Sequence, residues 1–196
     1  MKSIFYLSLF FISLQLSAQT TEKPERIPAA YFRIYYVLPG AVGDNVLSKA
    51  NKGILGLGAA VTLVTLNRFH FIAGYEFTKY EITNRSLAGN LEHTYVNNFY
   101  AEVLYKIPVT TTIDVDPKLA IGQIAVGQRN EGKSYGRQYG VSLTPGIMID
   151  YKAFGNFRLF AGINYCLSFP KTNTNNEYKS FFGTLQQVNL IAGIKL

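Results

Sequence analysis

The sequence predicts an all-β protein, an eight-stranded antiparallel up-and-down transmembrane β-barrel. Three observations lead to this prediction. Only 16% of the 196 residues are charged, against about 25% in soluble domains. Apolar residues alternate with small or polar ones in segment after segment. These segments run for about ten residues or more, the length that a tilted strand needs to cross a bilayer, whereas strands of globular proteins usually have about five or six residues.

The first 18 residues have the pattern of a secretory signal peptide. Lys2 supplies the positive charge, residues 4–16 form an apolar core, and Ser17-Ala18 offer a small-residue cleavage site. The apolar run is too short for a transmembrane helix, and the alternative is a buried N-terminal helix. Residues 19–30 are then expected to form a periplasmic lead-in, and residues 31–196 the outer-membrane barrel domain.

Eight segments of the mature chain show the alternation of a strand, and none shows a convincing helical period. The predicted strands are 31–38, 53–66, 69–82, 94–107, 118–128, 139–152, 157–169 and 184–196.

The connections between these strands alternate in length. Residues 67–68 and 153–156 are short, and residues 108–117 form an intermediate connection that fits the alternation least well. Outer-membrane barrels have short periplasmic turns and longer extracellular loops. The segments predicted to be long loops are 39–52, 83–93, 129–138 and 170–183.

The third predicted strand, FHFIAGYEFTKY, has one apolar face and one face that carries a charged residue. Phe69, Phe71, Tyr75 and Phe77 share one face, while Glu76 lies in the middle of the other. We expect the apolar face to contact lipid and the other face to line the barrel interior. Aromatic residues near the strand ends predict two interfacial girdles, formed by Phe69, Tyr105, Tyr151 and Phe157 at one end and by Tyr80, Tyr95, Tyr139 and Phe169 at the other.

Charged residues on the inward faces are predicted to form a structural network in the lumen. An isolated buried charge is costly, so each carboxylate must be paired or hydrated, and Glu76 and Glu102 are each expected to have a cationic neighbour. Eight strands enclose a space that side chains can fill. The predicted members are the acids Glu76, Glu102 and Asp150 and the bases Arg33, Lys106, Arg158 and Lys195.

Two of the predicted strands do not fit the regular alternation of an apolar outer face and a polar inner face. Pro145 falls inside the sixth strand, and because a closed barrel has no free edge for a missing N–H group, we expect a bulge there. The fifth strand, residues 118–128, has apolar residues on both faces, so its inward face is not predicted.

The signal peptide and the Gly-rich strands GILGLGAAVTL, GVSLTPGIMIDY and QQVNLIAGIKL resemble the small eight-stranded outer-membrane barrels of the OmpA/OmpX type. The chain looks closest to the outer-membrane β-barrel proteins common in Bacteroidetes. The resemblance implies a monomer in the cell outer membrane, in contact with its lipids. It also implies that the barrel-assembly machinery reads the last strand, which here ends in Leu196 in place of the usual aromatic residue.

No residue is predicted to be catalytic, to bind a cofactor or to ligate a metal. Cys166 is the only cysteine, which excludes an internal disulfide and a cysteine-based zinc site. The net charge of +7 is spread over the predicted lumen and loops, with no basic stripe interleaved with aromatic residues, so nucleic acid is not an expected partner.

The functional hypothesis is therefore a structural or surface-interaction role, in envelope integrity or adhesion, with binding in the long loops. Two alternatives stay open. Barrels of the lipid A deacylase type use a lipid-facing His with a Ser two residues on, but here Ile72 follows His70 and Tyr95 follows His93 at that spacing. A soluble periplasmic lipocalin-like barrel would bind lipid inside, with its faces inverted.

Overall fold

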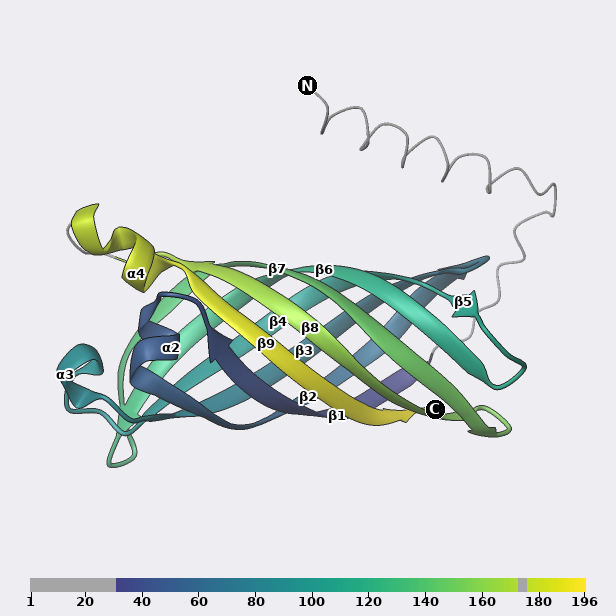
Figure 1. The fold of residues 1–196 in the computed structure, drawn as a ribbon, viewed down its shortest axis with the longest axis horizontal. Helices are drawn as coiled ribbons and strands as arrows, with labels where there is room; N and C mark the ends of the chain where they lie inside the picture. The colour runs from purple at the N-terminus through teal and green to yellow at the C-terminus, as the bar shows by residue number, and fades with distance from the viewer. Residues whose placement is uncertain (1–30, 173–175) are drawn as a thin grey trace, which may run out of the picture.

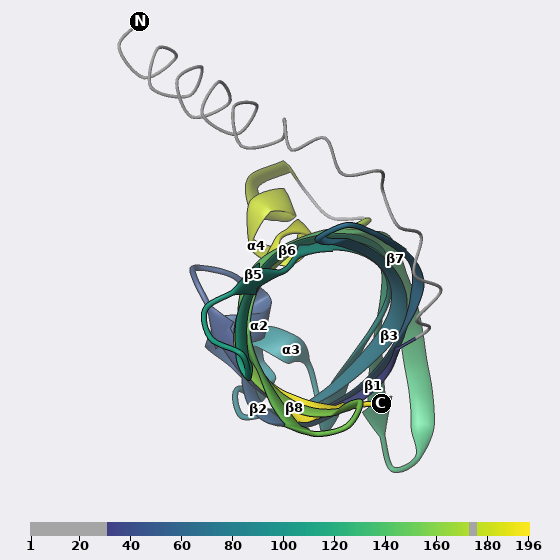
Figure 2. The ribbon, with the colours of Figure 1, turned by 90° about the vertical axis from the view of Figure 1, so that its right-hand side faces the viewer.

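The computed structural model of the chain describes residues 31–172 and 176–196. The predicted signal peptide and nearly all of the predicted lead-in lie outside these residues. Eight long antiparallel strands curl into a closed ring, which Figure 1 shows from the side and Figure 2 from one end. The predicted up-and-down barrel is confirmed.

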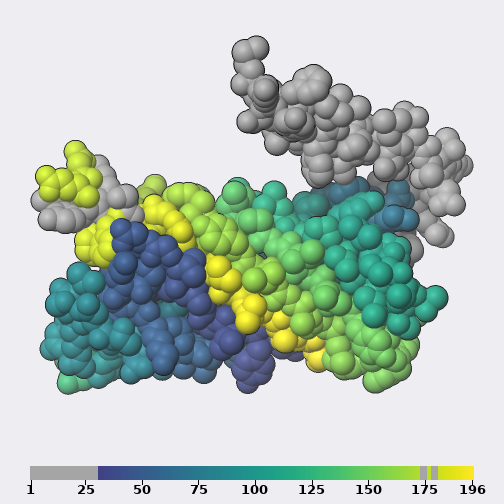
Figure 3. All heavy atoms as spheres, viewed as in Figure 1, coloured from purple at the N-terminus to yellow at the C-terminus, as the bar shows by residue number. Residues whose placement is uncertain are grey.

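The eight long strands follow one another around the ring in chain order. The pairing of β1 with β9 and of β4 with β6 completes the circle, and the two-residue strand β5 (Ile107–Pro108) pairs beside β6. In Figure 3 the yellow atoms of β9 lie between those of β1 and β8 on the outer wall. The long strands are β1 (Phe32–Val42), β2 (Asn51–Leu66), β3 (Phe69–Ile82), β4 (His93–Tyr105), β6 (Ile113–Asn130), β7 (Lys133–Phe154), β8 (Phe157–Pro170) and β9 (Leu185–Lys195).

The two ends of the barrel differ. The short helices gather at one end, which we call the loop end: α2 (Val46–Ala50), α3 (Arg85–Ala88), η1 (Asn176–Tyr178) and α4 (Lys179–Gly183). At the opposite turn end, two-residue turns join β2 to β3 and β7 to β8. There the backbone N–H of Phe32 donates to the carbonyl oxygen of Leu196 at 3.0 Å. None of the described helices is long and apolar enough to span a membrane.

The outside of the barrel is apolar and the inside is polar. Tyr36, Phe99 and Ile121 on the outer face are 68%, 66% and 63% exposed, whereas Glu102 and Asp150 are buried inside. Exposed apolar side chains in this number would be a large unfavourable surface in water. The arrangement is the inverse of a lipocalin-like barrel, so that interpretation is wrong.

The connection between β6 and β7 is not the predicted long loop. Residues 129–138 continue both strands into a hairpin, whose two-residue turn has positive φ at Glu131 (48°) and Gly132 (78°). Positive φ at both positions is the geometry of a type I′ turn, which suits the twist of paired strands. The register of the two strands shifts by one residue between Gly127, which lies opposite Arg137, and Gln128, which lies opposite Tyr135. Figure 2 shows the hairpin reaching outside the ring. Glycine and charged residues made the segment resemble a loop.

The fifth long strand, β6, begins at Ile113, five residues before its predicted start. Its even-numbered residues face inward, which resolves the phase that the sequence left open. Asp114, Asp116 and Lys118 therefore line the lumen, although residues 108–117 were predicted to be a connection. The alternation with Ile113 and Val115 is the sequence signal that could have revealed this extension.

Pro145 does not create a bulge. Leu143 pairs with Leu167 and Gly146 with Asn164 in one unbroken register, while pairing to β8 lapses at the two positions between them. Leu119 still lies opposite Pro145 in β6. The prediction is wrong because the missing N–H group interrupts the ladder locally, without insertion of an extra residue.

The aromatic girdles are present with one exception. Phe69 and Tyr105 pair at the turn end with ring centroids 4.8 Å apart, and Tyr139 is exposed near the loop end. Tyr80, predicted to join the loop-end girdle, is instead fully buried inside the barrel. Tyr80 is on the same inward face of β3 as Glu76. The alternation of the strand therefore points its side chain into the barrel, although it lies near the strand end.

Candidate functional site

Three cations of the predicted network lie together in the turn-end half of the lumen. Arg33, Lys195 and Arg158 lie side by side on β1, β9 and β8, because Lys195 is in register with both of the others. Like charges in neighbouring register positions repel one another. The compensating acids Glu102, Asp114 and Asp150 come from β4, β6 and β7; the Arg33–Glu102 pair crosses the interior of the barrel, whereas Arg158 reaches acids on the two nearest strands.

The first set of ion pairs is the Glu102 triad. One carboxylate oxygen of Glu102 accepts from Arg33 at 2.7 Å, and the other accepts from Lys118 at 2.9 Å. All three side chains are almost wholly buried. Lys118 was missed from the sequence because it stood at the edge of the predicted fifth strand.

The second set is the Asp150 cluster. Asp150 accepts from Arg158 Nε at 2.5 Å and from Lys195 Nζ at 3.1 Å. Asp114 accepts from Arg158 and, at 3.1 Å, from Lys106. These contacts tie β6, β7, β8 and β9 together at the turn end. Because two carboxylates share the Arg158 guanidinium, neither is left buried without a cation.

Glu76 differs from the other two predicted lumen carboxylates. Its oxygens accept from the Tyr35 hydroxyl at 3.3 Å and from Asn189 Nδ2 at 3.1 Å. Within the described residues Glu76 makes no ion pair, so none of the four predicted cations pairs with it. The hydroxyls of Tyr35 and Tyr100 lie 2.8 Å apart, and this tyrosine pair spans the lumen between β1 and β4.

Two glycines make room for these tyrosines. A Cβ atom at Gly58 would overlap the Tyr35 ring, and one at Gly74 would overlap the Tyr100 ring. Glycine at these inward positions therefore allows each ring to lie flat against the barrel wall. The tyrosine pair crosses the interior at this level, where an eight-stranded barrel has little room for a wide channel.

We expect Gly58→Ala to destabilise the folded barrel by about 1–3 kcal/mol, because the added methyl group displaces the Tyr35 ring. Urea unfolding in phosphatidylcholine vesicles would measure this change. Gly127→Ala is the matched control, since the nearest atom to its added Cβ is 3.8 Å away. Equal stability of the two variants would show that the tyrosine pair is not tightly packed.

The two histidines lie on opposite faces of the sheet. His70 is buried on the inward face, where its Nδ1 lies 3.0 Å from the Thr65 hydroxyl oxygen. The His93 ring packs against Tyr95 with centroids 6.2 Å apart. Among residues 31–172 and 176–196, no group of three His, Cys, Asp or Glu side chains is arranged to hold a metal ion.

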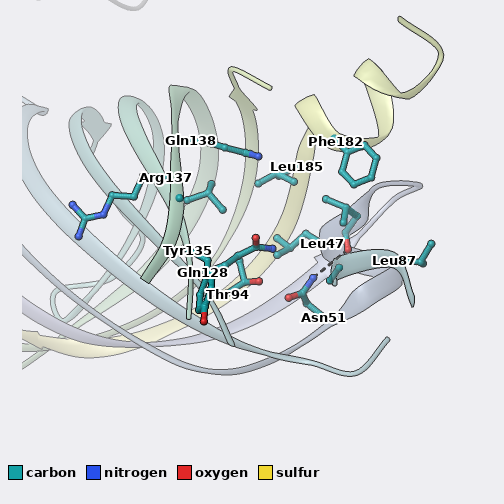
Figure 4. A pocket seen from close by; sticks show the side chains of 14 residues that line it. Leu47, Asn51, Leu87, Thr94, Gln128, Tyr135, Arg137, Gln138, Phe182 and Leu185 are labelled. Atoms are coloured by element: carbon teal, nitrogen blue, oxygen red, sulfur yellow. Dashed lines mark hydrogen bonds between the residues drawn. The ribbon is translucent and has the colours of Figure 1, made fainter. Parts of the chain in front are cut away.

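A pocket of about 290 Å³ lies inside the barrel mouth at the loop end (Figure 4). Helices α2 and α3 and the segment before β9 contribute Leu47, Leu87 and Phe182 to its lining. Its inner wall includes Thr94 and Asn51; within residues 31–172 and 176–196, the buried Thr94 hydroxyl and Asn51 Oδ1 have no hydrogen-bond partner. Free polar atoms in an apolar hollow are typical of a small-molecule site.

A closed ring of eight long strands, with an apolar outside and a polar, charged inside, defines a small transmembrane β-barrel of the outer-membrane type. Solved structures agree at the level of the fold. Neisserial surface protein A (NspA) has 16% sequence identity and a TM-score of 0.62 over 85% of this chain and 96% of its own. The resemblance to small eight-stranded outer-membrane barrels is confirmed at this level.

Two further structures match less closely. The N-terminal β-barrel domain of Pseudomonas aeruginosa OprF has 12% identity and a TM-score of 0.44, over 85% of this chain and 97% of its own. Ail of Yersinia pestis has 11% identity and a TM-score of 0.45, over 85% and 99%. No family model and no curated protein matches the sequence.

Proposed function

We propose that this chain is a non-catalytic barrel of the outer membrane with a structural or surface-interaction role, in envelope integrity or adhesion. The observation that carries the proposal is the filled lumen, where the Glu102 triad and the tyrosine pair connect opposite walls. A lumen closed in this way argues against general solute flow. It leaves a rigid scaffold that presents the loop end to the outside.

The orientation follows from the lengths of the connections. In outer-membrane barrels the short turns are periplasmic and the longer loops extracellular. Both Phe32 and Leu196 lie at the turn end, so the chain would enter and leave the barrel from the periplasm. The mouth pocket and helices α2, α3 and α4 would then face the cell exterior. Contact with outer-membrane lipids, a monomeric state and recognition of β9 by the assembly machinery belong to the same proposal.

The lipid-modifying alternative finds little support in the histidine positions. A barrel enzyme acting on a membrane lipid needs its catalytic side chains on the lipid-facing side, within reach of the scissile bond. His70 faces the lumen and is engaged with Thr65. His93 lies on the outer face of β4, beside Tyr95 and in register with Arg129, without a serine two residues on.

We expect the refolded protein to show no steady large-conductance openings in planar bilayers and to release no acyl chain from lipid A. A boiled and an unboiled sample should migrate differently on a gel, as a closed barrel resists detergent unfolding. Steady openings would make the protein a porin. Acyl release that disappears in His70→Ala or His93→Ala would make it an enzyme.

The surface role is tested in the native bacterium. A strain lacking the protein should become detergent-sensitive or lose adhesion, and the full-length chain should restore the property. A variant in which residues 171–184 are replaced by a short turn should still insert but should restore adhesion poorly. Full restoration by this variant would exclude the last loop from the interaction.

A further inference from the structure

A second hollow, of about 410 Å³, lies on the outer face of β3, β4, β6 and β7 near the loop end. The strand register places most of its residues in two adjacent rows, with Tyr75 and Phe99 in the row below and Arg129 and Ser134 in the row above; Lys79 lies at the end of one row and borders the hollow. One row runs Phe77, Asn97, Ala125 and Tyr139, and the next, closer to the loop end, runs Lys79, Tyr95, Gly127 and Arg137. We call this feature the outer groove.

Small residues on β6 form the floor of the outer groove. Ala125 and Gly127 leave space there, and a Cβ atom added to Gly127 would meet only Arg137 Cγ, at 3.8 Å, and a backbone oxygen, at 4.0 Å. The side chains on neighbouring strands stand higher than this floor. The result is a furrow in the lipid-facing wall over Ala125 and Gly127, between β4 and β7.

Aromatic pairs make the walls rigid and apolar. Phe77 stacks on Tyr95 with centroids 5.7 Å apart, and Tyr75 packs against Phe99 at 4.7 Å. The Tyr75 hydroxyl donates to Asn97 Oδ1 at 2.5 Å, which pairs these two polar groups with each other. An acyl chain along the floor would contact the faces and edges of the aromatic rings.

Cations rim the outer groove toward the loop end. The Arg129 guanidinium lies 5.3 Å from the centroid of the Tyr95 ring, and Lys79 Nζ lies 5.8 Å from the same centroid. Arg137 borders the groove from β7, and Figure 4 shows its side chain pointing away from the mouth pocket. Among the described residues, none of these three cations forms an ion pair, in contrast to the lumen cations.

Acidic residues near this rim do not neutralise it. Glu81 lies on the outer face of β3, opposite His93. A carboxylate oxygen of Glu92 accepts from the backbone N–H of Glu131 at 3.2 Å. The three cations are therefore left without an ion pair among the described residues, at the level of the aromatic girdle where lipid headgroups begin.

We propose that the outer groove binds a lipid of the outer leaflet whose phosphorylated headgroup carries a net negative charge, unlike zwitterionic phosphatidylcholine. The acyl chain lies on Ala125 and Gly127 between the aromatic walls, and the phosphate contacts Arg129, Arg137 and Lys79. Guanidinium groups suit this role because their fork of N–H donors matches phosphate oxygens. The inference rests on the proposed placement in the outer membrane, with the loop end outside.

The test uses the full barrel refolded into phosphatidylcholine vesicles doped with diphosphorylated lipid A, followed by gentle extraction and native mass spectrometry. Wild type should retain the phosphorylated lipid. Arg129→Gln/Arg137→Gln should retain about tenfold less, because two charge-assisted contacts are lost. Gly127→Leu, which fills the furrow without changing charge, should also lose the lipid.

The matched control is Lys49→Gln/Arg85→Gln, which removes the same charge from exposed positions of α2 and α3 that do not line the outer groove. It should retain the lipid like wild type. Equal loss in this control, equal retention of phosphatidylcholine by wild type, or full displacement by soluble glycerol phosphate would each overturn the inference. A gel shift on boiling, measured in undoped vesicles, reports insertion separately. Failure to insert would therefore reject the membrane placement, whereas insertion without lipid selectivity would reject only the outer groove.

Discussion

Glu102→Gln is expected to destabilise the barrel by about 3–5 kcal/mol, because it leaves Arg33 and Lys118 buried without an opposing charge. The substitution keeps the shape of the side chain, so the effect reports charge and not a cavity. Urea unfolding in phosphatidylcholine vesicles, followed by the gel shift of the folded form, would give the free energy of unfolding.

Two companion variants make this measurement specific. Glu81→Gln removes an exposed outer-face carboxylate and should change stability by less than about 0.5 kcal/mol. Arg33→Met/Glu102→Leu/Lys118→Met replaces the whole triad with apolar groups and should recover most of the loss, since burying three charges is itself costly. A loss below about 1 kcal/mol for Glu102→Gln would mean that water, not pairing, satisfies the two cations.

Ile121→Arg is expected to cost about 2–4 kcal/mol, because this side chain faces outward halfway along β6 and would place a cation in the hydrocarbon region. Its neighbours in register are Ala101 on β4 and Leu143 on β7. The same unfolding assay applies, with the protein in vesicles.

Val109→Arg is the control for this charge. Val109 is also exposed, but it lies in the turn-end connection after β5, where an arginine should cost about 0–1 kcal/mol. Similar losses for both variants would place Ile121 outside the membrane interior. That result would contradict the proposed position of the bilayer on the barrel.

The sequence was most informative where one face of a strand contacts lipid and the other lines the lumen. The segment FHFIAGYEFTKY was predicted within residues 69–82, and β3 has these same limits in the structure. A one-residue error in phase would expose Glu76 to lipid, so the alternation leaves little freedom. The predicted limits of β8 likewise differ from the structure by one residue.

The partners of the lumen charges could not be predicted from local pattern. Glu76 and Glu102 both stand at inward positions of neighbouring strands, yet one contacts Tyr35 and Asn189 while the other contacts Arg33 and Lys118. What separates them is which side chains reach across from the far wall. That depends on the register of strands distant in the sequence. Charged inward residues such as Asp114 also look like loop residues until the strand containing them is known.

The pairing of β1 with β9 has a consequence for how the molecule is assembled. Arg33 and Lys195, neighbours in the sheet, are separated by almost the whole described chain. Folds dominated by such distant contacts form slowly. A chain stopped before Leu185 would leave β1 and β8 as open sheet edges and Asp150 without Lys195. Open edges recruit strands from other molecules. Docking of β9 is therefore the event that both completes the electrostatics of the lumen and removes the risk of aggregation.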